Sequence, residues 1–313
     1  MDGVTDHIQR RVIASVNGTC GVSAISLCVS EFVRVTGGVV PDAVLSRHCP
    51  ELATQGRTVG GVPVFVQLLG SDPAAMAGTA KRAIELGAPG IDLNFGCPAK
   101  TVNRHDGGAS LLKTPSRVGK ITAAVRRAVP LPFPVSVKIR VGWDSSDHVV
   151  ALAHAVADGG GDWLTIHGRT RTQQYRPPVD WAAIGQAADA IEIPVVANGD
   201  LFTPAQLHAC ARASGCRAFM AGRGVMAAPN WFRWARGYDG NAPNLAAHSD
   251  TLAKFVVQSR LAAVADPRIL RRVKQWMRMA ADIRPELAPV FNAMKRLSRL
   301  PDAMAVLRRA GRD

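Results

Sequence analysis

Several features that mark common classes of protein are missing from this sequence. The six cysteines include no Cys-x-x-Cys pair, which argues against a zinc module or a disulfide framework. No run of about 18 apolar residues is present, and no basic stretch followed by an apolar segment opens the chain. We therefore expect a cytoplasmic protein with no membrane span, no signal peptide and no metal site.

Acidic residues are also scarce relative to basic ones. The chain has 24 Asp and Glu residues against 38 Lys and Arg residues, which gives a formal net charge of +14. An enzyme that acts on a small substrate does not need such a positive field, so the charge favours a polyanionic partner. The alternative is a general contribution to solubility, or membership of a basic, arginine-rich proteome.

Short apolar runs alternate with helical patterns over most of the chain, beginning at residue 64. One helix is expected from about Ser71 to Leu86, and a further strand near Ser26–Phe32. The other apolar runs are residues 64–68, 91–94, 135–139, 163–167, 194–198 and 218–222. Repeated strand–helix units predict a parallel sheet. The fold class is α/β, and the seven strands are one short of a closed TIM (β/α)8 barrel.

A polar residue stands at the end of strand after strand. These residues are Gln67, Asn94, Lys138, His167, Asn198 and Arg223. In a barrel the carboxyl ends of the strands meet at one mouth, where such barrels carry their chemistry. The alternative, in which each residue separately caps a helix or remains solvated, requires a series of coincidences. A barrel is therefore favoured over an open sheet, with residues 1–237 forming the catalytic domain.

The pattern changes after about Gly237. Residues 238–246 read as a polar linker, and residues 247–313 as a helical domain with 14 Lys or Arg residues against 6 Asp or Glu residues. Within 268–282, one predicted helical face is apolar: Ile269, Val273, Trp276, Met277 and Ala280. The other carries basic residues: Arg268, Arg271, Arg272, Lys274 and Arg278. A basic face of this kind is either solvated or a grip on nucleic acid.

Two short motifs and a cysteine indicate chemistry at the mouth. Asn198-Gly199-Asp200 and Gly222-Arg223-Gly224 follow the last two strands, where glycine backbone and an arginine can hold phosphate oxygens. Lys138 and His167 can supply charge or hydrogen-bond donors to a flavin ring, and Gln67 can bond its edge. Cys97 lies in a tight loop after the strand that ends at Asn94, where a thiol can act as an acid or nucleophile. A buried, inert cysteine is the alternative.

Taken together, these motifs resemble the tRNA-dihydrouridine synthases in order and spacing, over nearly the whole chain. The segments that carry the resemblance are 92–100, 137–143, 167–170, 197–200 and 222–224. Within that family, residues 31–35 and 272–276 resemble the bacterial C-type subfamily, which modifies uridine 16.

The resemblance implies FMN as cofactor, NADPH as reductant and tRNA as partner. Hydride would pass from N5 of FMN to carbon 6 of a uracil flipped into the mouth, and Cys97 would deliver a proton to carbon 5. The FMN-binding positions that it implies are Met1, Asp2, Gln67, Lys138, His167, Asn198, Gly199, Asp200, Gly222 and Arg223. The implied contacts to the base or to tRNA are Arg34, Asn94, Tyr175, Arg272, Lys274 and Arg296. For Tyr175 the alternative is a surface aromatic that packs on Arg176 and Pro177. We expect the protein to be a monomer.

The chain departs from the family pattern at two places. It opens at Met1-Asp2-Gly3, without the apolar first strand and Pro-Met-x-Gly turn that the family has. Either the true start lies upstream, which we favour because an unpaired sheet edge is costly, or the barrel is open at its first position. An insertion is also expected around Gly18–Ser26, before the second strand.

Two other functions compete with the synthase. One is an FMN barrel enzyme for a small pyrimidine, similar to dihydroorotate dehydrogenases, although the basic helical domain would then have nothing to hold. The other is a truncated, non-catalytic protein that only binds tRNA, which would be colourless.

Overall fold

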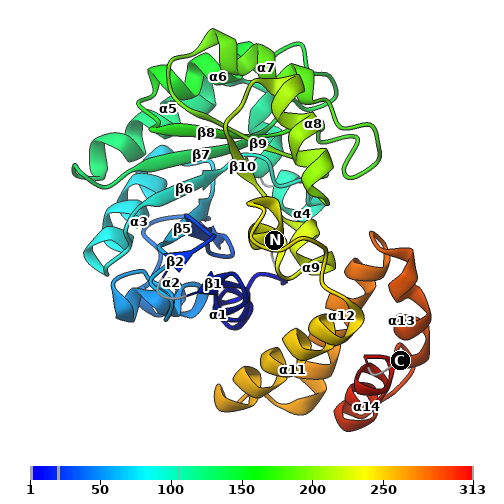
Figure 1. Cartoon of the computed structure of the whole chain (residues 1–313). Helices are drawn as coiled ribbons and strands as arrows, with labels where there is room; N and C mark the ends of the chain where they lie inside the picture. The colour runs from blue at the N-terminus through cyan, green and yellow to red at the C-terminus, as the bar shows by residue number, and fades with distance from the viewer. Residues whose placement is uncertain (1–2, 20–21, 105, 312–313) are drawn as a thin grey trace.

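The computed structural model describes residues 3–19, 22–104 and 106–311. A parallel sheet curls through the larger part of the molecule (Figure 1). Its strands are β3 (Cys28–Val29), β4 (Val33–Arg34), β5 (Val64–Leu69), β6 (Ile91–Asn94), β7 (Val135–Arg140), β8 (Trp163–His167), β9 (Val195–Asn198) and β10 (Ala218–Met220). β3 and β4 both pair with β5 and run along the same edge, so the sheet is seven positions wide, as the sequence predicts.

The sheet has the architecture of a TIM-type barrel that is open at one position. The strand order runs β10-β9-β8-β7-β6-β5 and then β3 and β4, and no strand in the described ranges joins β10 to β3 or β4. The predicted strand at Ser26–Phe32 is interrupted: β3 ends at Val29 and β4 begins at Val33, although the Ser30 backbone N–H still donates to the Phe65 carbonyl of β5 at 2.9 Å. At this interruption the Ser30 hydroxyl accepts the Gln67 backbone N–H at 3.1 Å, which satisfies a donor that the broken strand leaves without a carbonyl.

Helices cover the convex face of the sheet, and local sequence explains where they begin (Figure 1). They are α2 (Asp42–His48), α3 (Pro73–Glu85), α5 (Pro115–Ala128), α6 (Val149–Asp158), α7 (Trp181–Ala190) and α8 (Pro204–Ser214). Asp72 caps α3 by accepting the Ala75 N–H at 2.7 Å, and Thr203 with Gln206 forms a capping box at α8. Proline at the first position of α3, α5 and α8 suits a turn whose N–H groups have no helical partner.

Shorter elements complete the larger part of the molecule. They are α1 (His7–Val16), the hairpin β1 (Gly18–Thr19) and β2 (Val22–Ser23), η1 (Pro50–Thr54), α4 (Lys100–Arg104), η2 (Gly108–Lys113), α9 (Arg223–Ala227) and α10 (Trp231–Ala235). The β1–β2 hairpin occupies the predicted insertion at Gly18–Ser26. Arg236 secures its end by donating to the Ala24 carbonyl at 2.9 Å.

The C-terminal region is helical, as predicted. It contains α11 (Leu245–Leu261), α12 (Asp266–Ala281), η3 (Pro285–Leu287), α13 (Ala288–Met294) and α14 (Leu300–Ala310). α11 begins two residues before the helical domain expected at 247–313, because the Asn244 side chain caps it by accepting the Ala247 N–H at 2.9 Å. On α12 the whole predicted apolar face is buried, while Arg268, Arg271 and Arg278 are exposed.

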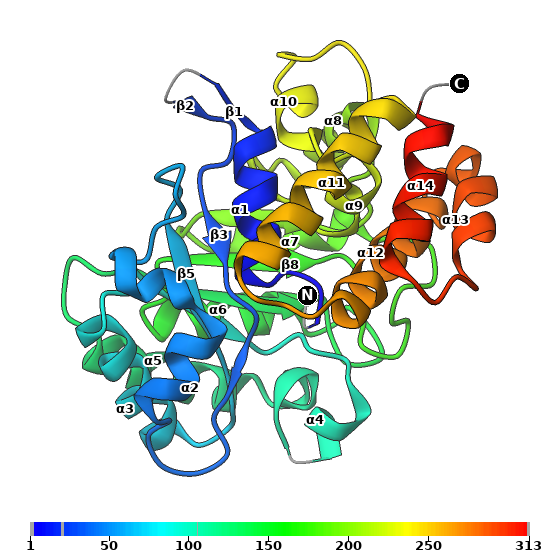
Figure 2. The same cartoon turned by 90° about the horizontal axis from the view of Figure 1, so that it is seen from below.

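The helical region packs against the barrel through α1, α9, α11 and α12. α1 lies along α11 in both views, and the Arg11 side chain donates to Gln258 at 3.1 Å (Figures 1 and 2). Trp276 of α12 is 3% exposed and donates its indole N–H to the Met226 carbonyl of α9 at 2.9 Å. In the part of the chain that the structure describes, no helix combines the length and apolarity needed to cross a membrane.

Candidate active site

The register of the sheet aligns the polar strand ends. Asn94 lies opposite Lys138 between β6 and β7, and His167 lies opposite Arg140 on one side and Asn198 on the other. Because all these strands are parallel, their carboxyl ends share one edge of the sheet. The predicted mouth residues of β6 to β9 are therefore neighbours in space.

A hydrogen-bonded network lines the β5–β6–β7 side of this mouth. The Gln67 amide donates to Oδ2 of Asp92 at 2.7 Å and accepts from the Asn94 amide at 2.9 Å. Ser136 donates to the other Asp92 oxygen at 2.7 Å, and Asn94 accepts the Gly96 N–H at 3.0 Å. Asp92 is 1% exposed, and burial raises the pKa of its carboxyl. Both ends of the Gln67 side chain are thus held, while one amide N–H remains for a ligand.

Cys97 lies in the loop after β6, half-buried, and its backbone is held from two sides. Its carbonyl accepts the Ala109 N–H and the Asn103 side-chain amide, both at 3.1 Å. Gly108 has a φ of +61°, and a Cβ there would lie 2.9 Å from the Cys97 carbonyl oxygen, so the approach requires glycine. These contacts fix the backbone that carries the Cys97 thiol.

The mouth carries an excess of positive charge. Burial, followed by the charge of Arg140, lowers the pKa of Lys138 from its ordinary 10.5 to about 8. Burial, followed by the charges of Lys138 and Arg140, lowers the pKa of His167 well below its ordinary value. Within the described residues, Nε2 of His167 is buried and has no hydrogen-bond partner. A neutral imidazole and a readily deprotonated ammonium therefore face this space.

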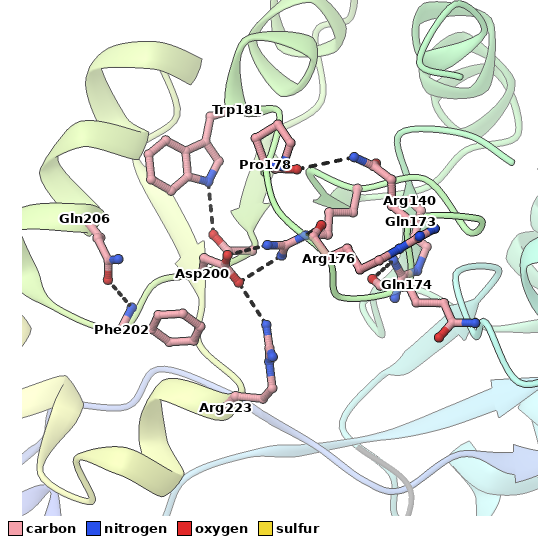
Figure 3. Close-up of polar contacts among 12 residues, drawn as sticks. Arg140, Gln173, Gln174, Arg176, Pro178, Trp181, Asp200, Phe202, Gln206 and Arg223 are labelled. Atoms are coloured by element: carbon pink, nitrogen blue, oxygen red, sulfur yellow. Dashed lines mark hydrogen bonds and ion pairs between the residues drawn. The ribbon is translucent and has the colours of Figure 1, made fainter. Parts of the chain in front are cut away.

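The loop after β9 combines a glycine that tolerates no side chain with a shared carboxylate. Gly199 has a φ of +126°, and a Cβ would lie 2.7 Å from Cγ2 of Val179 and 2.9 Å from Cδ2 of His167. The Asp200 carboxylate pairs with Arg169 and, at 2.9 Å, with Arg223 (Figure 3). The Asp200 side chain is therefore used inside the protein, and it orients the Arg223 fork rather than facing an anion itself.

Tyr175 lies over the mouth, in contrast to the alternative in which it packs on Arg176 and Pro177. Its ring centroid is 4.7 Å from the Arg223 guanidinium, 5.4 Å from that of Arg140, and 6.2 Å from the His167 ring. The residue is 50% exposed. An aromatic between two guanidinium groups with an open edge is suited to contact a flat ring.

Arg140 was given no role from sequence, although it organises the mouth. It is 2% exposed and donates to the carbonyls of Gly96 at 3.0 Å, Thr170 at 3.0 Å and Gln174 at 2.7 Å. These carbonyls adjoin Cys97 and Tyr175. The sequence does contain a signal for this role: Arg140 stands two residues after Lys138, so the two side chains share one face of β7. Asp92 stands two residues before Asn94 and shares its face of β6 in the same way.

The residues expected to contact tRNA fall into two groups. Arg34, at the end of β4, and Arg296 are exposed. Arg272 and Lys274 instead make contacts within the chain. Arg272 donates to the carbonyls of Gly3 and Val4 and pairs with Asp6 at 3.1 Å. Lys274 donates to the Leu297 carbonyl at 2.5 Å. Met1 and Asp2, expected to bind FMN, lie outside the described residues.

Comparison with known proteins finds relatives that match nearly the whole chain. The family model described as dihydrouridine synthase (Dus) matches residues 1–304. The chain belongs to the dihydrouridine synthase family. The tRNA-dihydrouridine(16) synthase of Ralstonia nicotianae is 40% identical over 313 residues, which covers 99% of this chain and 94% of that protein. The protein of the same name from Escherichia coli K12 is 39% identical, covering 96% of this chain and 94% of that protein.

A solved structure supports the fold alone. A variant of NCR from Zymomonas mobilis superposes with a TM-score of 0.50 at 14% identity, covering 78% of this chain and 83% of that one.

The family makes this dihydrouridine synthase an FMN-dependent oxidoreductase, and the mouth suits that cofactor. The orphaned His167 nitrogen supplies a buried polar contact for a bound group. Lys138, Arg140 and Arg223 supply positive charge that Asp92 and Asp200 only partly balance, as an electron-rich ring and a phosphate require.

Proposed function

We propose that this enzyme reduces the C5–C6 double bond of uridine 16 in the D-loop of tRNA, with NADPH as the reductant. The carrying observation is the placement of Cys97 in a hydrogen-bonded loop three residues after Asn94, at the cationic mouth of the barrel. The position of the target uridine rests on the likeness to synthases named for position 16.

The residues of the mouth divide into two roles. We assign Gln67, Lys138, His167, Asn198, Gly199, Asp200, Gly222 and Arg223 to the FMN site, with Asp200 acting through Arg223. When bound, FMN supplies the hydride that reduces carbon 6 of the uracil. Lys138 and His167 contribute a charge and a buried imidazole nitrogen beside the flavin ring.

Cys97 holds the second hydrogen of the reaction as the proton on its Sγ. It delivers this proton to carbon 5 as the hydride arrives at carbon 6, and the thiolate that remains takes a proton from solvent after the product leaves. Asn94 and Tyr175 hold the flipped base, the first through its remaining amide N–H and the second through its ring. The Arg140 guanidinium joins the loop that carries Cys97 to the segment that carries Tyr175, by donating to the carbonyls of Gly96 and Gln174.

The charge distribution supports tRNA as the substrate rather than a free pyrimidine. The helical domain carries much of the net charge of +14, and its exposed arginines include Arg268, Arg271, Arg278 and Arg296. Extraction of a base from a folded RNA requires that the flanking phosphates are held. We further propose that the enzyme works as a cytoplasmic monomer. Its exposed large apolar side chains come mostly from separate segments, which supports a single copy.

The test compares Cys97→Ala with wild type on tRNA that lacks dihydrouridine. We expect wild type to form dihydrouridine at position 16, and Cys97→Ala to keep the flavin absorption but lose at least about 100-fold in turnover. Cys216→Ala, which removes a buried thiol two residues after the end of α8, is the matched control and should keep wild-type turnover. Product at another uridine would refute the position, and turnover of free pyrimidines instead of tRNA would refute the substrate.

A further inference from the structure

We propose that Asp92 is a positioning residue that fixes which way the side-chain amides of Gln67 and Asn94 face. In this orientation each amide keeps an N–H donor for a carbonyl oxygen of a bound ring. The mouth therefore selects a ring that carries carbonyl oxygens, such as uracil, against a ring that carries an amino group, such as cytosine. The inference rests on the proposed function for the identity of the bound base.

Three hydrogen bonds in series join Asp92 to the loop that carries Cys97. The Gln67 amide nitrogen donates to Oδ2 of Asp92 at 2.7 Å, and the Gln67 oxygen accepts from the Asn94 amide nitrogen at 2.9 Å. The Asn94 oxygen in turn accepts the backbone N–H of Gly96 at 3.0 Å. Every bond in this series points the same way, from the Gly96 N–H toward the Asp92 carboxylate.

The two ends of the series leave the amides no choice of orientation. A carboxylate only accepts hydrogen bonds, and a backbone N–H only donates one. A reversed Gln67 would place its oxygen against a carboxylate oxygen of Asp92. A reversed Asn94 would place its NH2 group against the Gly96 N–H. Either reversal leaves buried polar atoms without partners, which is costly in a dry interior.

Asp92 acts on a ligand only through these amides, because it lies below them and is covered. The register places Gln67, Asp92 and Ser136 side by side on β5, β6 and β7, with Asn94 two residues nearer the carboxyl end of β6. Asp92 is 1% exposed, and its Oδ1 accepts the Ser136 hydroxyl at 2.7 Å. Asn94 is half-buried at the mouth. The buried carboxylate thus sets the orientation, and the residue at the surface of the mouth presents the donor.

Exchange of the carboxylate and the amide between positions 92 and 94 tests this orientation while keeping the shape of both side chains. Asn94→Asp alone leaves Gln67 between two carboxylates, and its amide nitrogen can face only one of them. Adding Asp92→Asn supplies an N–H to the Gln67 oxygen, so that Gln67 turns and donates to the carboxylate at position 94. The whole series is then satisfied again, in the reversed orientation.

Urea unfolding of the full chain freed of flavin measures the effect. Asn94→Asp should lower the unfolding midpoint by roughly 0.5 to 1 M urea, because a buried polar atom loses its partner. Asp92→Asn should lower it by less than about 0.3 M, since an amide at position 92 still accepts from Gln67 and donates to Ser136. The Ser136 hydroxyl then turns to the Ile91 carbonyl, from which it is 3.3 Å away. The double variant should recover at least about half of the loss that Asn94→Asp causes.

Two controls separate amide orientation from the removal of a negative charge. Asp144→Asn removes an exposed carboxylate from the loop after β7, and it should not restore the stability of Asn94→Asp. Gln67→Leu removes the amide that couples the two positions, so in that background Asp92→Asn should no longer restore Asn94→Asp. Restoration by Asp144→Asn, or restoration that persists without Gln67, would show that charge repulsion is the cause and would overturn the inference.

The preference for uridine carries the test to the ligand. The measurement is the Kd of tRNA with uridine at position 16 against the Kd of the same tRNA with cytidine there. Wild type should bind the uridine form about 10-fold more tightly, as one correctly paired base contact provides. The double variant presents a carboxylate oxygen in place of the Asn94 N–H, so it should bind the cytidine form at least as tightly. A double variant that keeps the wild-type preference would refute the role of Asp92.

The unfolding measurements need neither FMN nor tRNA. If wild type forms no dihydrouridine, the proposed function fails, while the unfolding of the four proteins still decides whether Asp92 orients the amides. If wild type forms dihydrouridine and Asp92→Asn does not restore Asn94→Asp, the role of Asp92 fails and the proposed function stands.

Discussion

Replacement of Arg140 by lysine should damage stability and turnover together. Arg140 is 2% exposed, and its guanidinium donates to the carbonyls of Gly96, Thr170 and Gln174. A lysine ammonium keeps the charge but, as a compact point donor, reaches one of these carbonyls in place of three. Two charge-assisted hydrogen bonds are lost and two buried carbonyls are left without a donor. At about 1.5 to 3 kcal/mol for each lost bond, the free energy of unfolding should fall by roughly 3 to 6 kcal/mol.

The assay is urea unfolding followed by circular dichroism, paired with the rate of dihydrouridine formation. Because the carbonyls adjoin Cys97 and Tyr175, a loosening of either loop by about 1 Å should lower turnover on the order of 100-fold. Arg82→Lys is the matched control, since Arg82 forms a two-pronged pair with Asp42 at the surface, and it should change neither quantity measurably. If Arg140→Lys unfolds within about 0.5 kcal/mol of wild type and keeps its turnover, Arg140 does not organise the mouth.

Two further predictions concern pH. Because the pKa of Lys138 is about 8 in the fold and 10.5 ordinarily, the unfolded chain binds more protons between these values, so the stability of the flavin-free protein should rise from pH 8 to 10.5. Lys138→Met should remove this rise in the free energy of unfolding, and a rise that persists in the variant would contradict the lowered pKa of Lys138. The second prediction concerns His248, which is fully buried. Burial lowers the pKa of its imidazole to about 4, so the unfolded chain binds an extra proton as the pH falls below 6.5. Protonation of His248 in the unfolded chain should lower the unfolding free energy of the wild type by about 2 kcal/mol between pH 7 and pH 5. The fall measured for His248→Leu over the same range should be smaller by about that amount. Equal falls in the two proteins would show that His248 is not the source.

Much of the fold was predictable because its signals are local. Apolar runs and helix caps lie within a few residues of the elements they define, so the predicted helix at Ser71–Leu86 corresponds to α3, and the apolar face of α12 is buried in full. The break between β3 and β4 was not predictable in the same way. It depends on Ser30 meeting Gln67, 37 residues away in sequence.

The site shows the same division between local and distant signals. His167 ends β8 and Lys138 lies two residues before the end of β7, and the register of a parallel sheet brings such positions together. The partners of Asp200 and Arg272 could not be foreseen, because Arg169 precedes Asp200 by 31 residues and the Val4 carbonyl lies 268 residues from Arg272. A charge that looks available to a ligand in the sequence is in both cases engaged by another part of the chain.

The most direct test of the central claim follows the flavin absorption of the purified protein without oxygen. NADPH is added first, and tRNA that lacks dihydrouridine second. We expect flavin bands that bleach with NADPH and return with this tRNA, while tRNA that carries cytidine at position 16 leaves them bleached. A protein that stays colourless, or a flavin whose bands do not return with the uridine-bearing tRNA, would contradict the assignment of this chain as a working tRNA-dihydrouridine synthase.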